Sequence, residues 1–185
     1  MANTEHISEE IRNNLVKRCS GLGDRFSKTT AKPTEGRLAE TFSVWALTNF
    51  DESPKEATFS EIVTDLELWH GQIEVDRQDF WSVRFCCQED QVQLMRVMGQ
   101  DYGSKVSHGI DLVDKKFPGE CIVRMLEVPG YFIDSFWMHD AINSEDYFLI
   151  FNAPYGQRLQ EWETYRYDVF LEGLRKEGPA YGIKF

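Results

Sequence analysis

The stretch CIVRMLEVPGYFIDSFWMHDAINSEDYFLIFN, residues 121 to 152, decides the expected fold, because it holds three dense apolar runs separated by short turn-forming or polar segments. Pro129 and Gly130 stand between the first two runs. Proline fixes φ at the second position of a tight turn and glycine takes the positive φ of the third, so this pair predicts a type II turn. Residues 141 to 145 form a polar connection to the third run. The stretch therefore predicts a three-stranded antiparallel meander over about 120 to 152.

The middle run of this meander is apolar on both faces. Side chains alternate across a strand. The alternation gives two apolar sets, which are Tyr131, Ile133 and Trp137 on one face and Phe132, Phe136 and Met138 on the other. A strand needs this pattern when both of its faces are covered, or when its second face carries a pocket. Each large side chain that becomes fully buried contributes about 1.5 to 3 kcal/mol, so we expect the meander to be the energetic centre of the fold.

Apolar residues at helical spacing predict a helix near the N-terminus, and they are Ile7, Ile11, Leu15, Cys19 and Leu22. The segment from 20 to 36 is rich in Gly, Ser, Thr and Lys, which is typical of a loop or linker. We therefore interpret residues 1 to 36 as a helix followed by a flexible segment. Residues 37 to 50 fit either a helix or a strand, and the spacing of Leu38, Phe42 and Trp45 favours the helix.

Five further segments complete the expected secondary structure. Thr58 and Glu61 have the spacing of a capping box, and the apolar residues that follow predict a helix over 58 to 75. Alternation predicts a strand over 79 to 87. Residues 88 to 103 return to helical spacing through Val92, Met95, Met98 and Tyr102. Residues 103 to 119 are interpreted mostly as loop, with a short strand around 110 to 113. A last helix over 157 to 176 is expected to end at Gly178.

These elements predict a single α+β domain over residues 1 to 185, with an antiparallel sheet centred on the meander and helices packed on it. A chain of 185 residues and 21.6 kDa is long enough to bury roughly 70% of its unfolded surface in one core. Four cysteines without C-x-x-C spacing, and a polar stretch where a leader would need an apolar run, predict reduced thiols and a cytoplasmic protein. No apolar run approaches the ~20 residues that cross a bilayer, so no membrane association is expected. The net charge of −11 disfavours nucleic acid as a partner.

The sequence lacks the phosphate-binding glycine patterns, the G-x-S-x-G elbow and the H-E-x-x-H motif. His139 and Asp140 are adjacent, but alternation along a strand points them to opposite faces. Asp134 lies inside the most apolar run, where a carboxylate must be paired, hydrogen-bonded or neutral. His70 has Glu67 and Glu74 at helical spacing, which indicates an ion-paired surface unless a second ligand cluster exists. His108 lies in a Ser-His-Gly segment interpreted as loop.

Two interpretations of function remain. The first is a non-enzymatic binding or protein-interaction module, whose partner is a second copy of the chain or another protein. The aromatic content of 14% and the two-sided apolar strand indicate this interpretation. The second is a small-molecule enzyme or ligand carrier with a pocket on one sheet face near Asp134 and His139. The pocket candidates are Asp134, His139, Trp137, His70 and His108, and no metal or cofactor is predicted.

Overall fold

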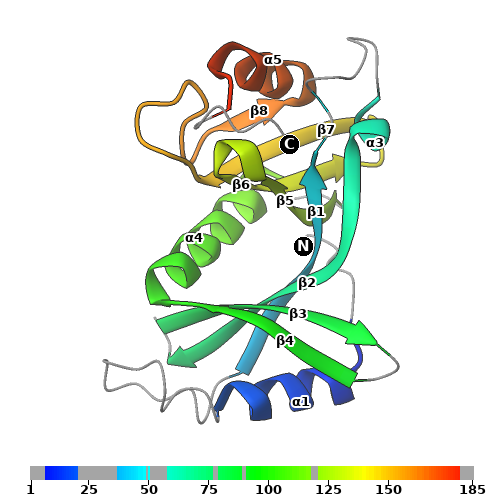
Figure 1. The fold of residues 1–185 in the computed structure, drawn as a ribbon, viewed down its shortest axis with the longest axis vertical. Coiled ribbons are helices and arrows are strands. Elements are labelled where there is room, and N and C mark those ends of the chain that lie inside the picture. Colours follow the sequence, from blue (N-terminus) through cyan, green and yellow to red (C-terminus); the bar gives the residue numbers. More distant parts are fainter. Residues whose placement is uncertain are drawn as a thin grey trace. The chain divides into compact units, whose positions relative to one another are not determined.

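The structure is a computed structural model that describes residues 7–20, 37–48, 50, 58–76, 79–88, 91–117 and 121–179. The helices and strands of these residues are α1 (Glu9–Ser20), β1 (Arg37–Leu47), α3 (Phe59–Ile62), β2 (Val63–Asp76), β3 (Asp79–Gln88), β4 (Gln91–Met98), α4 (Gln100–Lys116), β5 (Cys121–Val128), the 3₁₀ turn η2 (Pro129–Tyr131), β6 (Ile133–Asp140), β7 (Glu145–Asn152), β8 (Thr164–Arg166) and α5 (Tyr167–Glu177). The predicted mixture of helices with a sheet is confirmed, and Figure 1 shows these elements.

The hydrogen-bonded strand order is β4-β3-β2-β1-β5-β6-β7-β8, an eight-stranded sheet within the described residues. β1 pairs with β5 in parallel, with Val44 opposite Met125, whereas β5, β6, β7 and β8 pair antiparallel in chain order. The prediction of a purely antiparallel sheet is therefore wrong. A parallel pair requires a long crossover, and the segment between β1 and β5 provides it with β2, β3, β4 and α4.

The chain forms two compact units. The meander unit comprises 44–66 and 109–179 of the described residues, and the hairpin unit comprises 7–43 and 67–108. β1, β2 and α4 each continue from one unit into the other. The single-domain assignment stays a prediction, and each unit is described by itself below.

One face of the meander unit is covered by α5 and α3. The aromatic rings of Phe148 in β7 and Phe170 in α5 stack with centroids 4.4 Å apart, and Phe59 of α3 meets Phe148 edge to face at 5.1 Å. Leu126 of β5 and Ile133 of β6 belong to the same buried cluster. Figure 1 shows α5 above the ribbons of β7 and β8.

The other face of the meander unit is covered by the second half of α4. Gly109 of α4 lies so close to β6 that a Cβ there would be 2.7 Å from Cε2 of Phe136. Phe117, just after α4, packs against Tyr147 of β7 with ring centroids 5.1 Å apart. Lys116 at the end of α4 donates a hydrogen bond to the Thr164 hydroxyl at 3.0 Å. The middle strand β6 is thus sheltered on both faces.

The hairpin unit has its own core between α1 and the strands β2, β3 and β4. Leu15 of α1 is fully buried together with Phe85 of β3 and Val92 of β4. The predicted N-terminal helix is confirmed, and its Ser8 hydroxyl accepts a hydrogen bond from Ile11 N at 3.3 Å. The expected flexible segment lies almost entirely at 21–36, outside the described residues. The predicted strand at 79 to 87 is confirmed as β3.

The predicted helix over 58 to 75 is wrong beyond its first turn. The capping box is present, because the Thr58 backbone N–H donates to the Glu61 carboxylate at 2.7 Å. The helix ends at Ile62 and β2 follows directly. Val63 and Thr64 are β-branched, which favours a strand. The spacing of apolar residues was misleading because β2 also buries the polar His70 and Gln72.

Four other segments also differ from the predictions. Residues 91 to 98 form β4 rather than a helix, and 100 to 116 form α4 rather than a loop. Residues 37 to 47 form β1, so the alternative strand interpretation was correct there. The last helix begins at Tyr167, ten residues later than predicted because β8 and a loop precede it, and Gly178 caps it by donating to Leu174 O at 3.1 Å.

The predicted type II turn is replaced by a 3₁₀ turn. Pro129, Gly130 and Tyr131 form η2, and the left-handed conformation falls on Phe132, whose φ is 55°. Phe132 N donates to Pro129 O at 3.3 Å, which closes the turn. The chain reversal between β5 and β6 is retained.

Candidate functional site

A polar cluster lies at one end of the face that α3 and α5 cover. Asp146, the second residue of β7, lies directly opposite His139 of β6, and Trp137 lies two residues before His139 on the same face. One oxygen atom of the Asp146 carboxylate, Oδ1, accepts a hydrogen bond from Trp137 Nε1 at 2.7 Å and lies 2.9 Å from His139 Nδ1. A carboxylate that binds Nδ1 fixes both the orientation of the imidazole and the position of its proton.

Arg124 adds a cation to this end of the sheet. It stands opposite Trp137 in the β5–β6 register. Its guanidinium carbon lies 4.6 Å from the ring centre of Trp137 and 5.4 Å from that of Trp45 in β1. The two indole rings meet edge to face at 5.6 Å. We call Trp45, Arg124, Trp137, His139 and Asp146 the aromatic-polar cluster.

The cluster leaves one imidazole nitrogen open to solvent. The His139 side chain is 33% exposed and that of Asp146 is 20% exposed. His139 Nε2 makes no hydrogen bond in the part of the chain that the structure describes. With the proton on Nδ1, Nε2 carries a lone pair that can accept a proton from a molecule at the surface.

A second candidate site is the loop between β7 and β8. Its two ends are held together by backbone hydrogen bonds, because Trp162 N donates to Ile150 O at 2.7 Å and Ile150 N donates to Glu163 O at 3.2 Å. Ala153 N also donates to Oε1 of Glu161 at 3.0 Å. A compact loop with closed ends has the form of an Ω-loop, a class that frequently carries function. Leu159 anchors the loop in the core, where it is 2% exposed.

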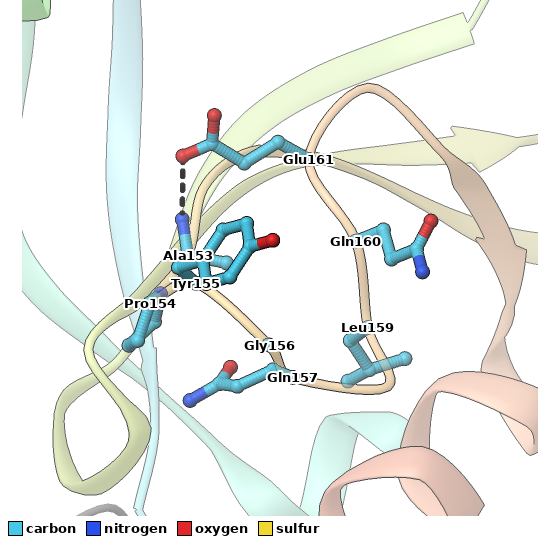
Figure 2. Close-up of a pocket in the computed structure, with 8 residues that line it drawn as sticks. All are labelled: Ala153, Pro154, Tyr155, Gly156, Gln157, Leu159, Gln160 and Glu161. Carbon is cyan, nitrogen blue, oxygen red and sulfur yellow. Dashed lines mark hydrogen bonds between the residues drawn. The ribbon is translucent and has the colours of Figure 1, made fainter.

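This loop surrounds a cavity of about 500 Å³ that is open to solvent on one side. Figure 2 shows the residues that line it, which are Ala153, Pro154, Tyr155, Gly156, Gln157, Leu159, Gln160 and Glu161. The Tyr155 side chain is fully exposed. Gln157 Nε2 donates to Tyr131 O at 3.3 Å, and its Oε1 atom is buried without a hydrogen-bond partner among the described residues. Because this oxygen atom is itself buried, the amide of Gln157 serves to hold the loop against Tyr131.

The structure brings two of the predicted pocket residues together and separates the third. Trp137 and His139 share the aromatic-polar cluster through Asp146. Asp134 points to the opposite face of β6, where it accepts a hydrogen bond from Asn152 Nδ2 at 3.0 Å. Because side chains alternate along β6, no rotation of a side chain brings Asp134 to His139.

The other two predicted pocket residues belong to the hairpin unit. His70 is fully buried in β2, so its expected place on an exposed helix face is wrong, and its Nε2 lies 3.2 Å from Ser82 Oγ. Burial, reinforced by the positive charge of Arg84, holds the pKa of His70 well below its usual value of 6.5. His108 lies on an exposed position of α4 rather than in a loop. The expectation that these five residues bind a ligand stays a prediction.

The described residues show no arrangement typical of a reactive cysteine, a metal site or a membrane-spanning helix. Cys86, Cys87 and Cys121 are free thiols, and burial raises the pKa of Cys87 and Cys121, which disfavours the reactive thiolate. The described side chains include no group of three or more histidine, cysteine or acidic residues placed to hold a metal ion. Among the described helices, none is both long and apolar enough to span a bilayer.

Sequence reasoning missed Asp146, Arg124 and Trp45 as members of the aromatic-polar cluster. The meander alone contained the signal for Asp146, because antiparallel pairing of two adjacent strands around the 141–144 connection places it opposite His139. Trp45 required the parallel pairing of β1 with β5, which no local pattern indicates.

Comparison with known proteins found no matching family model, no matching curated protein and no matching solved structure. The functional inferences below therefore depend on the geometry of this chain alone.

Proposed function

We propose that this chain is a non-enzymatic binding module whose ligand cavity lies within the loop of residues 153–161. One observation carries the proposal: the loop surrounds an open cavity of about 500 Å³ that is lined by apolar, aromatic and amide side chains, among them Leu159, Tyr155 and Gln157. Small-molecule pockets commonly occupy about 300 to 1,000 Å³.

Apolar side chains of the lining, among them Pro154 and Leu159, offer contacts for the body of a ligand. The fully exposed ring of Tyr155 adds an apolar surface that a ligand would cover. Because the ends of the loop are tied to β7, the cavity needs little reorganisation on binding.

The test is a ligand screen that follows backbone and side-chain amide signals by NMR. A ligand of the cavity is expected to shift the resonances of Gln157 and Gln160, and Tyr155→Ala is expected to weaken it. The matched control is Ile142→Ala, since Ile142 is another strongly exposed apolar residue of the meander unit, in the 141–144 turn outside the cavity. A set of binders that leaves residues 153–161 unperturbed would contradict the proposal.

A second candidate function is small-molecule catalysis at the aromatic-polar cluster. The specific observation is that Asp146 orients His139 through Nδ1 while Nε2 stays open to solvent, which is the arrangement of a general base. Asp146 thus orients His139 from the neighbouring strand, which the adjacent Asp140 cannot do because it points to the opposite face. Hydrolysis of an activated ester is expected to fall in His139→Asn and to persist in His108→Asn. Equal rates in both variants would exclude this function.

A homo-oligomer or a protein partner, and a cytoplasmic location, stay predictions. Size-exclusion chromatography with light scattering tests the first directly. A strictly monomeric chain across a wide concentration range would contradict self-association and leave the cavity proposal intact.

A further inference from the structure

The His139–Asp146 pair supports an inference about the reaction itself, which rests on the second candidate function, catalysis at the aromatic-polar cluster. We propose that His139 Nε2 is the nucleophile of that reaction and accepts the acyl group of an activated ester or thioester. A covalent acyl-imidazole then forms, whereas a general base would transfer a proton alone. The tautomer of the imidazole, the exposure of Nε2 and the residues beside it support this role.

The hydrogen bonds of Asp146 fix the tautomer of His139. Asp146 Oδ1 lies 2.7 Å from Trp137 Nε1 and 2.9 Å from His139 Nδ1. An indole N–H only donates and an ionised carboxylate only accepts, so His139 Nδ1 is the donor to Asp146. In the neutral imidazole the lone pair therefore lies on Nε2. This lone pair is what a nucleophilic imidazole uses to attack a carbonyl carbon.

The Nε2 atom of His139 is available to a molecule in solvent. The His139 side chain is 33% exposed, and Nε2 makes no hydrogen bond within the described residues. Trp137 is only 8% exposed, so it holds the Asp146 carboxylate from the buried side. The imidazole is thus anchored at Nδ1 and open at Nε2. An anchored ring gives up little freedom when it attacks a substrate.

No hydroxyl or thiol of the described residues is hydrogen-bonded to His139 Nε2. The residues directly beside His139 on this face are Ile122 in β5, Asp146 in β7 and Trp137 in β6, and none of them has a hydroxyl or a thiol. Ser135 of β6 is fully buried and donates its hydroxyl to a backbone carbonyl oxygen at 3.5 Å. A histidine that activates a nucleophilic side chain needs that side chain within hydrogen-bond reach. The imidazole itself is therefore the nucleophile that this face offers to an acyl donor.

The proposed step needs only the acyl donor and water. His139 Nε2 attacks the carbonyl carbon, the C–O or C–S bond breaks, and the alcohol or thiol leaves. The resulting acyl-imidazolium is positively charged, and the Asp146 carboxylate stabilises it through the Nδ1–H hydrogen bond. Water then attacks the acyl carbon and the C–N bond breaks, which restores the imidazole. In the net reaction the hydroxyl of water joins the acyl group and its proton joins the leaving group.

The test mixes the full chain with 4-nitrophenyl trimethylacetate, whose bulky acyl group slows the hydrolysis of an acyl-imidazole. Release of 4-nitrophenol is expected to begin with a burst of about one equivalent per chain. Mass spectrometry of the acid-quenched chain should place the acyl group on the peptide that contains His139. Hydroxylamine should remove this group, because it cleaves an acyl-imidazole but not the amide that an acylated lysine would contain.

His139→Asn is expected to lose the burst, and the matched control His108→Asn, at an exposed position of α4, is expected to keep it. Asp146→Asn keeps an oxygen atom that accepts from Trp137 but removes the charge, so it should slow acylation about tenfold. The Trp137 Nε1–H resonance reports whether this end of the meander unit stays folded in each variant.

Three results would overturn the proposal. Hydrolysis that depends on His139 but shows neither a burst nor an acyl adduct would exclude the nucleophile and leave the general-base function standing. A burst that persists in His139→Asn would exclude both. A ¹⁵N spectrum in which the neutral imidazole of His139 carries its proton on Nε2 would exclude the lone pair on which the attack depends.

Discussion

Gly103 of α4 packs directly against the backbone of Phe80 in β3, so that a Cβ at position 103 would stand 2.0 Å from the Phe80 carbonyl oxygen. Backbone cannot rotate away from such a contact as a flexible side chain can. Gly103→Ala is therefore expected to displace α4 from β3 and to lower the free energy of unfolding by about 2 to 4 kcal/mol. Urea unfolding followed by tryptophan fluorescence measures the loss.

Gly99 provides the control for this prediction. It lies one residue before α4, and a Cβ there would meet no atom within 4 Å. Gly99→Ala is expected to change the free energy of unfolding by no more than about 0.5 kcal/mol. Equal stability of the two variants would show that the close approach of α4 to β3 is not present in solution.

Asp146 stabilises the end of the meander unit through one carboxylate oxygen, Oδ1, which is hydrogen-bonded to both Trp137 Nε1 and His139 Nδ1. Asp146→Ala removes the acceptor of the Trp137 indole N–H. Because Trp137 is only 8% exposed, water replaces this acceptor poorly. The expected loss is about 1 to 3 kcal/mol, and Asp146→Asn should lose less because its amide oxygen still accepts. Urea unfolding gives the difference, and the Trp137 Nε1–H proton resonance should move upfield in Asp146→Ala alone. An unmoved resonance would argue that this hydrogen bond does not form.

The meander was predictable because its signals are local. Each of its three strands is a short apolar run, and the turns between them contain Pro129 and Gly130 or a polar connection. The two-sided burial of β6 also followed from its composition. The parallel partner β1 lies far away in sequence, and its contact with β5 depends on the crossover rather than on any pattern within β1.

The errors in β2 and α4 have specific physical causes. β2 buries His70 and Gln72, so the alternation that marks a strand is hidden when only apolar residues are counted. α4 contains Gly103 and Gly109, which are typical of a loop, yet each permits a close approach of the helix to a strand. In both segments tertiary packing outweighed the local pattern.

The site was predictable in part. His139 and Trp137 were singled out from their place in the middle strand, and their partner Asp146 follows from antiparallel register. The loop cavity was not predictable, because it depends on Gln157 reaching the carbonyl of Tyr131 and on Leu159 entering the core. Neither contact leaves a periodic signal in the sequence.

Phe132 holds a left-handed backbone conformation, with φ at 55° and half of its side chain exposed. For a residue with a Cβ this conformation costs about 1 to 2 kcal/mol, and glycine adopts it freely. Phe132→Gly should therefore be more stable than Phe132→Ala by about 1 kcal/mol in urea unfolding. At Val169, an exposed position within α5, the order should reverse, because glycine in a helix is about 1 kcal/mol less favourable than alanine. The same order at both positions would contradict the left-handed turn.

His70 is expected to make the hairpin unit sensitive to acid. Burial, with Arg84 adding to it, places the pKa of His70 in the folded state well below 6.5, the ordinary value that the unfolded chain should approach. Below about pH 6.5 the imidazole of His70 therefore binds a proton in the unfolded state but stays neutral in the folded state. The free energy of unfolding is highest above about pH 6.5 and decreases as the pH falls below this value. His70→Gln should remove this part of the pH dependence.

Ser82→Ala is the control variant. It removes the hydroxyl that lies 3.2 Å from His70 Nε2 and leaves the imidazole, so it should lower the free energy of unfolding but keep its decrease in acid. Urea unfolding at several pH values between neutral and mildly acidic tests both variants, and the imidazole proton resonances of His70 report its charge directly. A His70 signal that titrates near pH 6.5 in the folded protein would refute the buried neutral state.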